Sequence, residues 1–346
     1  FGGATTTTGS PSTCPPRSRS STGSFGDGKP SCQRGRFDPS SSPEISAAAV
    51  LLKHHLAPGD VLVMTAAVES LAAQHPGRYR VSVETTCPEI WENNPHVYPW
   101  QGEGRVIDLH YPAINDSHHM KTGHFMGAFV SYLGDSLGIP LTLSVNRPAL
   151  YLDAQEQEKL PDLPDRYFVV NAGTKTDFTC KGWGQRNYQA VVDHFAGRVP
   201  FVQIGEAHHL HQPLKGAVNK IGQTTPRQLF RLVHGSLGGI GPTTFLQHVH
   251  AALGRFYVCI LGGREPAWWC HYPTQTTFST MGQLKCCRER ACWRSRVTPL
   301  GDGDPKDGSL CELPVISGSE VVPACMEAVT PDMVIQALET YLRHGH

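Results

Sequence analysis

The sequence has no surplus of either charge, since 30 Lys and Arg residues balance 30 Asp and Glu residues. A general nucleic-acid binder needs an excess of basic side chains to meet the phosphate backbone, so this class is disfavoured. No apolar run approaches the ~18–20 residues that a membrane-spanning helix requires. We therefore expect a soluble protein whose partner is not nucleic acid.

Two phosphate-binding motifs are also missing. No Gly-x-Gly-x-x-Gly follows the first expected strand, and no Walker A sequence occurs anywhere in the chain. Both motifs place glycine backbone amides around phosphate groups. Their absence disfavours a dinucleotide-dependent oxidoreductase and an ATPase.

Large aliphatic residues are scarce at the amino terminus. Residues 1–45 contain no Leu, Val or Met, and 29 of them are Ser, Thr, Gly or Pro. Such a segment cannot bury enough apolar surface to offset its ordering entropy. We predict a disordered tail over residues 1–45. A transit peptide is the alternative, but the segment shows no amphipathic helical pattern.

The rest of the 346-residue chain is long enough for two domains of ordinary size. Apolar runs of strand length alternate with helical patterns, which predicts parallel sheets with right-handed crossovers. Strands are expected at residues 47–53, 79–85, 105–109, 167–171, 200–205, 237–241 and 256–261, and helices at 65–74, 124–137, 188–196, 226–234, 244–253 and 331–343. We predict an α/β protein with two Rossmann-like domains, 46–154 and 166–330, a Pro- and acid-rich linker at 155–165, and a C-terminal helix within 331–346.

Ligands of such folds bind beyond the carboxyl ends of the strands, which makes the loops there candidate sites. In the first half, Gly59 and Asp60 precede a helix. Asp60 is either a catalytic base or an acid that stabilises the helix N-terminus. In the second half, the loop at 172–186 is rich in hydrogen-bond donors, including Thr174 and Lys181, and a lysine there can contact a diphosphate.

A second phosphate-binding feature follows further along the chain. The glycine-rich run at 238–241 leads through Thr243 and Thr244 into a helix, and the backbone amides at a helix N-terminus attract anions. A glycine-rich turn by itself is weak evidence. The combination with a separate lysine loop in the same half favours a phosphate-bearing ligand.

Three segments together resemble the ADP-heptose:lipopolysaccharide heptosyltransferase family, glycosyltransferase family 9. They are 59–65 (Gly-Asp-Val-Leu-Val-Met-Thr), 181–183 (Lys-Gly-Trp) and 243–248 (Thr-Thr-Phe-Leu-Gln-His), and the likeness covers roughly residues 47–345. The resemblance implies a GT-B fold, in which two Rossmann-like domains face a cleft. It also implies that the first domain recognises the acceptor and the second binds the nucleotide sugar.

The resemblance also implies roles for individual residues. Asp60 matches the general base of the family, and Lys181 matches the lysine that contacts the donor diphosphate. Thr244 and His248 match the Thr and His at the helix end that cradles the phosphates. Glu206, just past Gly205, is a candidate for contacting the donor ribose.

Two positions depart from the family pattern, because Thr243 stands where the family usually has Asp and Phe245 where it has Gly. Donor contacts must therefore differ in detail. The segment 86–95, which contains Trp91, is outside the family pattern. Either it lines the acceptor side or it is a structural loop anchored by the tryptophan.

The reaction implied is an inverting transfer of a heptose or related sugar from a nucleoside-diphosphate donor, ADP-linked in this family, to a hydroxyl group. The acceptor would be a glycan, a lipopolysaccharide or a protein Ser or Thr. The resemblance implies a cytoplasmic enzyme and no catalytic metal. Peripheral membrane association and the oligomeric state stay open. The alternative is a catalytically inactive GT-B relative that binds a nucleotide sugar or a protein.

Cysteines are unevenly distributed, since seven of the 11 lie between positions 259 and 325. Their spacing within an irregular, turn-rich stretch predicts a Cys-rich insertion over 264–314 that is organised by a structural zinc or iron. The predicted ligands are Cys270, Cys287, Cys292 and Cys311, with Cys286 as the alternative to Cys287. Free thiols and disulfides are the other interpretations. The resemblance extends to bacterial autotransporter heptosyltransferases, whose similar insertion holds iron.

Histidine is abundant, with 18 residues. The groups His54-His55, His118-His119 and His208-His209 with His211 have no carboxylate or thiol at ligand spacing. We expect them to be surface or loop residues rather than a second metal site.

Overall fold

The computed structural model describes residues 47–112, 114 and 123–345. The predicted tail at 1–45 and the pair His118-His119 lie outside the described residues. All described residues belong to one unit, Ile45–His346. The helices of the described part are all too short or too polar to cross a membrane.

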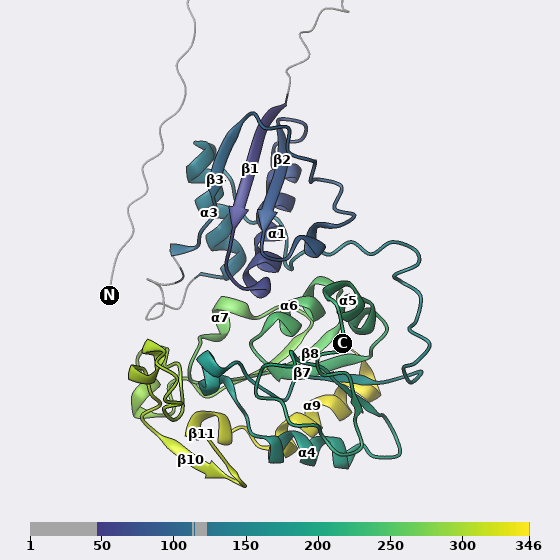
Figure 1. Ribbon diagram of the computed structural model, residues 1–346, viewed down its shortest axis with the longest axis vertical. Coiled ribbons are helices and arrows are strands. Elements are labelled where there is room, and N and C mark those ends of the chain that lie inside the picture. The colour runs from purple at the N-terminus through teal and green to yellow at the C-terminus, as the bar shows by residue number, and fades with distance from the viewer. Residues whose placement is uncertain (1–46, 113, 115–122, 346) are drawn as a thin grey trace, which may run out of the picture. The chain divides into compact units, whose positions relative to one another are not determined.

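The first half of the described chain is built on a small parallel sheet, drawn in purple to blue in Figure 1. Its strands are β1 (Ala48–His54), β2 (Tyr79–Thr85) and β3 (Arg105–Asp108), in the order β2-β1-β3. All pairings are parallel, as predicted. Two helices, α1 (Pro58–Gln74) and α3 (Phe125–Leu137), pack against each other beside this sheet.

Helix α1 begins earlier than predicted. The sequence pattern predicts a helix from Thr65, but the helix starts at Pro58, because proline is well suited to the first helical position. Asp60 therefore lies in the first turn of a helix. Most of the following side chains are buried, including Val61 and Met64, so this N-terminus is fixed rigidly by the core.

The second half contains six parallel strands in the order β6-β5-β4-β7-β8-β9. This is the order of a complete Rossmann sheet, whose ligand crevice lies where the strand order reverses, between β4 and β7. The strands are β4 (Phe168–Val170), β5 (Phe201–Gln203), β6 (Val218–Asn219), β7 (Gly238–Pro242), β8 (Phe256–Gly262) and β9 (Gln275–Ser279).

Alternating residues of these strands face opposite layers of helices, because successive side chains of a strand point to opposite faces. Phe168 and Val258 belong to the core beneath α4 (Gln185–His194) and α9 (Pro331–His344). Their neighbours Val169 and Tyr257 belong to the core shared with α5 (Pro226–His234) and α6 (Phe245–Ala252). Figure 1 shows the two helix pairs on either side of the strands.

Helix ends in this half carry clear sequence signals. Helix α5 starts with a capping box, in which the hydroxyl of Thr225 accepts from the backbone amide of Gln228 and the side-chain oxygen of Gln228 accepts from the backbone amide of Thr225. Helix α9 starts with Thr330 as its cap. Helix α6 is different, because the side chain of its cap residue Thr244 makes no capping bond.

A separate Cys-rich insertion over 264–314 is not confirmed. The segment includes α7 (Ala267–Cys270) and β9, which pairs with β8 and extends the sheet by one strand. Short helical turns and an antiparallel hairpin complete the second half: η3 (Lys285–Cys287), η4 (Pro305–Gly308), β10 (Pro314–Ser317), β11 (Glu320–Pro323) and α8 (Ala324–Glu327). Two further turns, η1 (Pro88–Trp91) and η2 (Thr176–Lys181), follow β2 and β4. The predicted domain boundaries and the linker at 155–165 stay a prediction.

Candidate functional site

A cavity of about 700 Å³ lies at the carboxyl ends of the strands. Its walls come from the start of α1, the loops after β4 and β5, the start of α6 and the residues that follow β8. All eight residues predicted for catalysis and donor binding line this cavity: Asp60, Thr174, Lys181, Gly205, Glu206, Thr243, Thr244 and His248. The fold thus brings together residues that are up to 188 positions apart, from 60 to 248.

Asp60 is half-buried in the first turn of α1. Burial raises the pKa of its carboxyl above the ordinary value, against the opposing effects of His54 and Lys181 and of a hydrogen bond from Tyr111. The phenol of Tyr111 therefore orients the carboxylate. A raised pKa makes this carboxylate a stronger proton acceptor than an exposed aspartate.

His54 lies close to Asp60 at the end of β1 and is buried, so the expectation of a surface or loop histidine is wrong for this residue. Its Nδ1 makes a 2.8 Å bond with the carbonyl oxygen of Leu109. Burial lowers the pKa of His54, so the ring is held neutral beside Asp60. The sequence does not distinguish the two adjacent histidines at this strand end, although His54 is buried and His55 is exposed.

Lys181 is fixed at the start of α6 by two contacts. Its Nζ lies 2.9 Å from Oε1 of Glu265 and donates over 3.1 Å to the carbonyl oxygen of Thr243. Burial alone would raise the pKa of Glu265, but the charges of Lys181 and Arg264 outweigh it and hold that pKa below its ordinary value. An ionised carboxylate therefore stands beside the lysine, close to the position where Thr243 replaces the acid of the resembled family.

The N-terminus of α6 faces the cavity. Backbone amides in the first turn of a helix have no partner within the helix and carry a partial positive charge. The hydroxyl of Thr244 is held by a 3.4 Å bond from Nδ2 of Asn171 at the end of β4. Both residues line the cavity, which gives the helix end the character of an anion site.

His248 lies one turn further along α6. Its Nδ1 is 2.8 Å from the hydroxyl of Tyr272, and burial lowers the pKa of the ring to about 3. This imidazole is therefore neutral and can contribute a dipole but no charge. A Cβ added at Gly59 would lie 3.4 Å from Cδ2 of His248, which shows that the starts of α1 and α6 meet here.

The carboxyl end of β5 forms another wall. Gly205 and Gly173 press against the ring of His211, and a Cβ at either glycine would lie within 2.3 Å of a ring or backbone atom there. Glu206 is exposed beside them. His208, His209 and His211 also line the cavity, so they are loop residues, as expected, but are placed at the candidate site.

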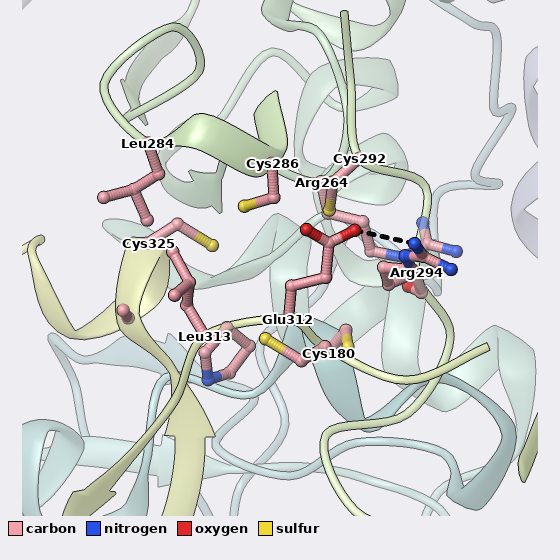
Figure 2. Close-up of a pocket in the computed structure, with 12 residues that line it drawn as sticks. Cys180, Arg264, Leu284, Cys286, Cys292, Arg294, Glu312, Leu313 and Cys325 are labelled. Carbon is pink, nitrogen blue, oxygen red and sulfur yellow. Dashed lines mark hydrogen bonds and ion pairs between the residues drawn. The ribbon is translucent and has the colours of Figure 1, made fainter. Parts of the chain in front are cut away.

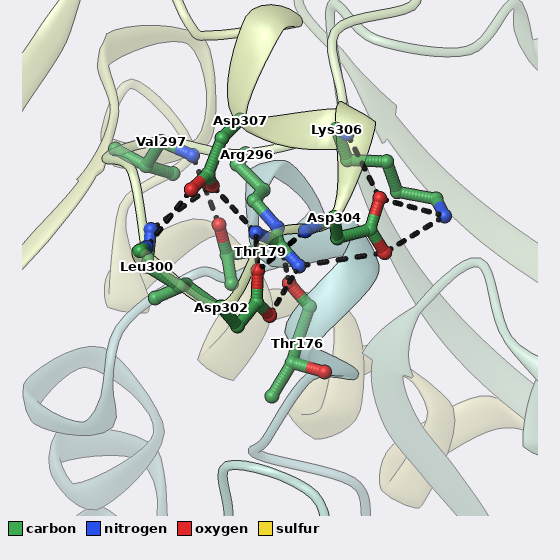
Figure 3. A network of polar contacts seen from close by, with 10 residues as sticks. Thr176, Thr179, Arg296, Val297, Leu300, Asp302, Asp304, Lys306 and Asp307 are labelled. Atoms are coloured by element: carbon green, nitrogen blue, oxygen red, sulfur yellow. Dashed lines mark hydrogen bonds and ion pairs between the residues drawn. The ribbon is translucent and has the colours of Figure 1, made fainter.

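The loop that carries Lys181 is fastened by a polar network, shown in Figure 3. The side chain of Arg296 is only 1% exposed; its Nε donates over 3.0 Å to the carbonyl oxygen of Thr176, and its Nη1 and Nη2 pair with Asp302 at 2.7 and 2.8 Å. A second tie joins the backbone amide of Val297 to the hydroxyl of Thr179 at 2.9 Å. Residues far along the chain thereby hold η2 and its lysine in place.

Five cysteines line a small cavity of about 10 Å³ next to this loop, which we call the sulfur cavity. Figure 2 shows thiols converging there from the loop after β4, the η3 turn, the segment at 292 and α8. They are Cys180, Cys286, Cys292, Cys311 and Cys325. All nine cysteines of the described residues are free, so the disulfide interpretation is not supported. A hydrogen bond with Cys180 lowers the pKa of Cys311 below its ordinary value.

The predicted ligand set is only partly brought together, and it needs correction. Cys292 and Cys311 line the sulfur cavity, as does Cys286, the alternative to Cys287. Cys270 does not, because it ends α7 with its Sγ 3.8 Å from the hydroxyl of Thr243. The thiol of Cys287 is directed to the carbonyl oxygen of Thr280, at 3.8 Å.

Cys180 and Cys325 belong to the sulfur cavity although they were not among the predicted ligands. Spacing could not identify them, because one lies before β5 and the other after β11. Within the described part of the chain, no three His, Cys, Asp or Glu side chains are grouped so as to hold a metal ion.

The segment 86–95 folds as a loop around η1. Ile90 and Trp91 are buried in the core that extends from the first half to α5 and α6, and none of the residues 86–95 lines the large cavity. Nη1 of Arg227 in α5 donates to the carbonyl oxygen of Glu89 at 3.0 Å. The structural interpretation of this segment is therefore favoured over an acceptor-binding one.

Several cavity residues were missed by sequence reasoning, among them Tyr111, Arg264, Glu265 and Trp293. Arg264 and Glu265 follow the buried strand β8 directly. The rule that strand ends carry function would have found them, had the segment not been assigned to an insertion. Tyr111 follows β3 in the same way.

Three comparisons with known proteins test the predicted resemblance. The sequence matches no family model and shows no significant match to a curated protein. Solved structures do match. A glycosyl transferase family 9 protein from Veillonella parvula has a TM-score of 0.58 at 14% identity, over 86% of this chain and 97% of its own. ADP-heptose lps heptosyltransferase II from E. coli has a TM-score of 0.57 at 12% identity, over 86% and 99%.

A third match is the iron-containing dodecameric glycosyltransferase TibC from enterotoxigenic E. coli, with a TM-score of 0.59 at 14% identity, over 86% of this chain and 77% of that one. These likenesses show that the chain has the GT-B fold of glycosyltransferases. The predicted resemblance to glycosyltransferase family 9 is thus confirmed in structure. At such low sequence identities the comparison shows the fold alone. Any inference about the reaction has to be drawn from the residues that line the cavity.

Proposed function

We propose that this protein is an inverting glycosyltransferase that moves a heptose or a related sugar from a nucleoside-diphosphate donor to a hydroxyl acceptor. One observation carries the proposal. A half-buried carboxylate, Asp60, and a fixed ammonium, Lys181, line the same cavity where the N-termini of α1 and α6 meet. This arrangement joins a base for the acceptor to a positive site for the leaving group.

The reaction follows from this geometry. Asp60 accepts the proton of the acceptor hydroxyl as its oxygen forms a bond to the anomeric carbon. The bond from that carbon to the phosphate oxygen breaks at the same time, and its electron pair leaves with the nucleoside diphosphate. The raised pKa of Asp60 suits proton acceptance late in the step, when charge has developed on the attacking oxygen.

The departing diphosphate needs positive charge that is already in position. Lys181 supplies a full charge, and the first turn of α6 supplies backbone donors and a hydroxyl from Thr244. The neutral ring of His248 adds a polar contact. Thr174, Gly205 and Glu206 extend the same wall and are proposed to contact the nucleoside, with Glu206 at the ribose.

The donor is proposed to be ADP-linked. Two of the matched structures are named for ADP-heptose, one as a lipopolysaccharide enzyme and one as a complex with ADP-D-beta-D-heptose. We propose that the six-stranded half binds this donor and that the three-stranded half, through Asp60 and Tyr111, meets the acceptor. A glycan, a lipopolysaccharide or a protein Ser or Thr presents the required hydroxyl.

A second candidate is a catalytically inactive relative that only binds a nucleotide sugar or a protein. Thr243 favours this candidate, because a hydroxyl replaces the acid of the resembled family and cannot act as a carboxylate. That hydroxyl lies 3.6 Å from the thiol of Cys259. Glu265 weakens this reading, since it supplies an ionised carboxylate 2.9 Å from Lys181.

Donor hydrolysis separates the two candidates. The full chain is incubated with a panel of nucleotide sugars, including ADP-heptose, and release of the nucleoside diphosphate is followed over time. An enzyme releases ADP from ADP-heptose with turnover above the uncatalysed rate. An inactive relative binds the nucleotide sugar in calorimetry but releases nothing. Mass spectrometry of the product formed in the native host then identifies the acceptor.

We further propose that the sulfur cavity holds a structural zinc or iron. The chemistry of the thiols supports this proposal, because thiolates bind both metals tetrahedrally, and TibC is described as iron-containing. The thiols would have to move closer together to bind an ion, since the described residues hold no group arranged as metal ligands. Four of the five cavity cysteines would bind the ion, with Cys292 and Cys311 common to the sequence prediction. The metal would fasten the loop of Lys181 through its neighbour Cys180. Elemental analysis of purified protein should find about one equivalent of zinc or iron, and finding neither contradicts this proposal.

A further inference from the structure

Trp293 has an unusual backbone conformation. Its φ is +56°, in the left-handed region that bulky residues avoid. Among the described residues, Asn93 is the other non-glycine residue with positive φ, and asparagine tolerates this region well. Strained conformations of this kind persist only where the surroundings enforce them, and they gather at ligand-binding segments.

The surroundings of Trp293 do enforce its position. Its backbone amide donates to the carbonyl oxygen of Arg264 at 3.3 Å, and Nε of Arg264 donates to the carbonyl oxygen of Arg294 at 2.6 Å. The guanidinium of Arg264 lies 4.8 Å from the centre of the indole, and the ring of Trp269 meets the indole at 88° with centroids 4.8 Å apart. The indole is therefore held from its backbone and by two neighbouring side chains.

The ring is nevertheless not part of a closed core. Trp293 is 41% exposed and lines the large cavity. An apolar ring that is both fixed and exposed offers a preformed surface, and binding to it requires little further ordering of the protein. This combination is expected of a ligand contact and not of a packing residue, which would be buried.

Two short chains of contacts connect Trp293 to the reacting groups. Through Arg264 and Glu265 it is linked to Lys181. Through Trp269 and Phe125, with ring centroids 5.9 Å apart, it is linked to Tyr111, the hydrogen-bond partner of Asp60. The indole thus lines the same cavity as the proposed base and the proposed diphosphate ligand and is connected to both through packed side chains.

We propose that the indole of Trp293 is the platform on which the sugar ring of the donor packs, so that this residue contributes to sugar selectivity. The inference rests on the proposed function. A pyranose presents C–H groups on its faces, and these carry partial positive charge that the negative face of an aromatic ring attracts. The diphosphate next to that sugar would then meet Lys181, and the anomeric carbon would lie between the two.

The substitution Trp293→Gly tests the platform without imposing a new strain, since glycine readily adopts positive φ. Isothermal titration of the full chain measures the Kd for ADP and for ADP-heptose, in the native protein, in Trp293→Gly and in Trp293→Phe. We expect Trp293→Gly to weaken ADP-heptose binding about tenfold and to leave ADP binding within twofold. Trp293→Phe should recover most of the loss, and the melting temperature of Trp293→Gly should not fall.

Two results overturn the inference. One is an unchanged Kd for ADP-heptose in Trp293→Gly. The other is an equal loss for ADP and ADP-heptose, which would place the ring at the nucleotide instead of the sugar. Failure of the proposed function looks different, because the native protein would then bind ADP-heptose without releasing ADP from it, or would not bind ADP-heptose at all. Absence of binding would remove the inference together with its basis.

Discussion

The ammonium of Lys181 lies 2.9 Å from the carboxylate of Glu265, which is itself paired with Arg264. The pair holds a long, flexible side chain at the start of α6 before any ligand binds. Charge that is fixed in advance stabilises a leaving group without a reorganisation step. Glu265 is therefore a positioning residue for the proposed diphosphate site.

The substitution Glu265→Gln separates positioning from binding. It leaves both nearby cations in place, so ADP should bind as tightly as before or more tightly. Turnover of the nucleotide sugar should fall about tenfold, because Lys181 loses its fixed partner. Steady-state kinetics and calorimetry measure the two effects. Glu339→Gln, in a surface ion pair with Arg198, is the matched control. Unchanged turnover in Glu265→Gln would show that the ion pair has no positioning role.

The bond from Tyr111 to Asp60 predicts a pH effect. This bond lowers the pKa of Asp60, in opposition to burial. In Tyr111→Phe that pKa should rise further. A base works only when deprotonated, so the acidic limb of the rate profile should move to higher pH in the variant. Rates measured from acid to neutral pH test this shift, with the exposed-site variant Tyr98→Phe as control. An acidic limb that stays at the same pH or moves to lower pH would contradict the role of Tyr111 as the hydrogen-bond donor to the base Asp60.

The sulfur cavity predicts a difference between two cysteines that sequence spacing treated alike. Cys292→Ser should lower the metal content of the purified protein to near zero, because its thiol lines the cavity. Cys270→Ser should keep the metal, because its thiol lies beside Thr243. Elemental analysis of both variants decides the matter. Loss of metal from both variants would favour the ligand set predicted from spacing, and loss from Cys270→Ser alone would contradict both sets.

Replacement of Trp183, which lies in the Lys-Gly-Trp segment shared with the resembled family, should change the stability of the protein and not its catalytic activity. Its side chain is fully buried, and Nε1 donates to the carbonyl oxygen of Val329 at 2.6 Å. In Trp183→Phe that carbonyl loses its partner, so the free energy of unfolding should fall by roughly 1–3 kcal/mol. Denaturant titration measures the loss. Activity per folded molecule should be retained, and a specific loss of turnover would assign Trp183 to the site.

Much of this fold could be predicted from local patterns. The strand containing Phe168 and the strand containing Tyr257 are continuous apolar runs, which is how strands buried on both faces look in sequence. Because function gathers at the carboxyl ends of parallel strands, the pattern of strands and loops was enough to single out Asp60, Lys181 and Thr244. The start of α1 at Pro58 was missed, although proline at a first helical position is a known signal.

The remainder depended on contacts between distant segments. Cys180 and Cys325 meet other thiols only because η2 and α8 pack against the residues after β9. Trp293 reaches the cavity through a backbone conformation that its residue type does not favour. Glu265, which follows β8, contacts Lys181 beside Thr243, which follows β7. None of these relationships follows a spacing rule, because each is set by tertiary packing.

The central claim is that Asp60 is the base of a sugar-transfer reaction, and Asp60→Asn tests it most directly. The variant removes the proton acceptor and keeps the shape of the side chain. Release of ADP from ADP-heptose should fall at least a hundredfold, while the Kd for ADP, measured by calorimetry, should stay within twofold of that of the native protein. Full turnover in Asp60→Asn would contradict the account.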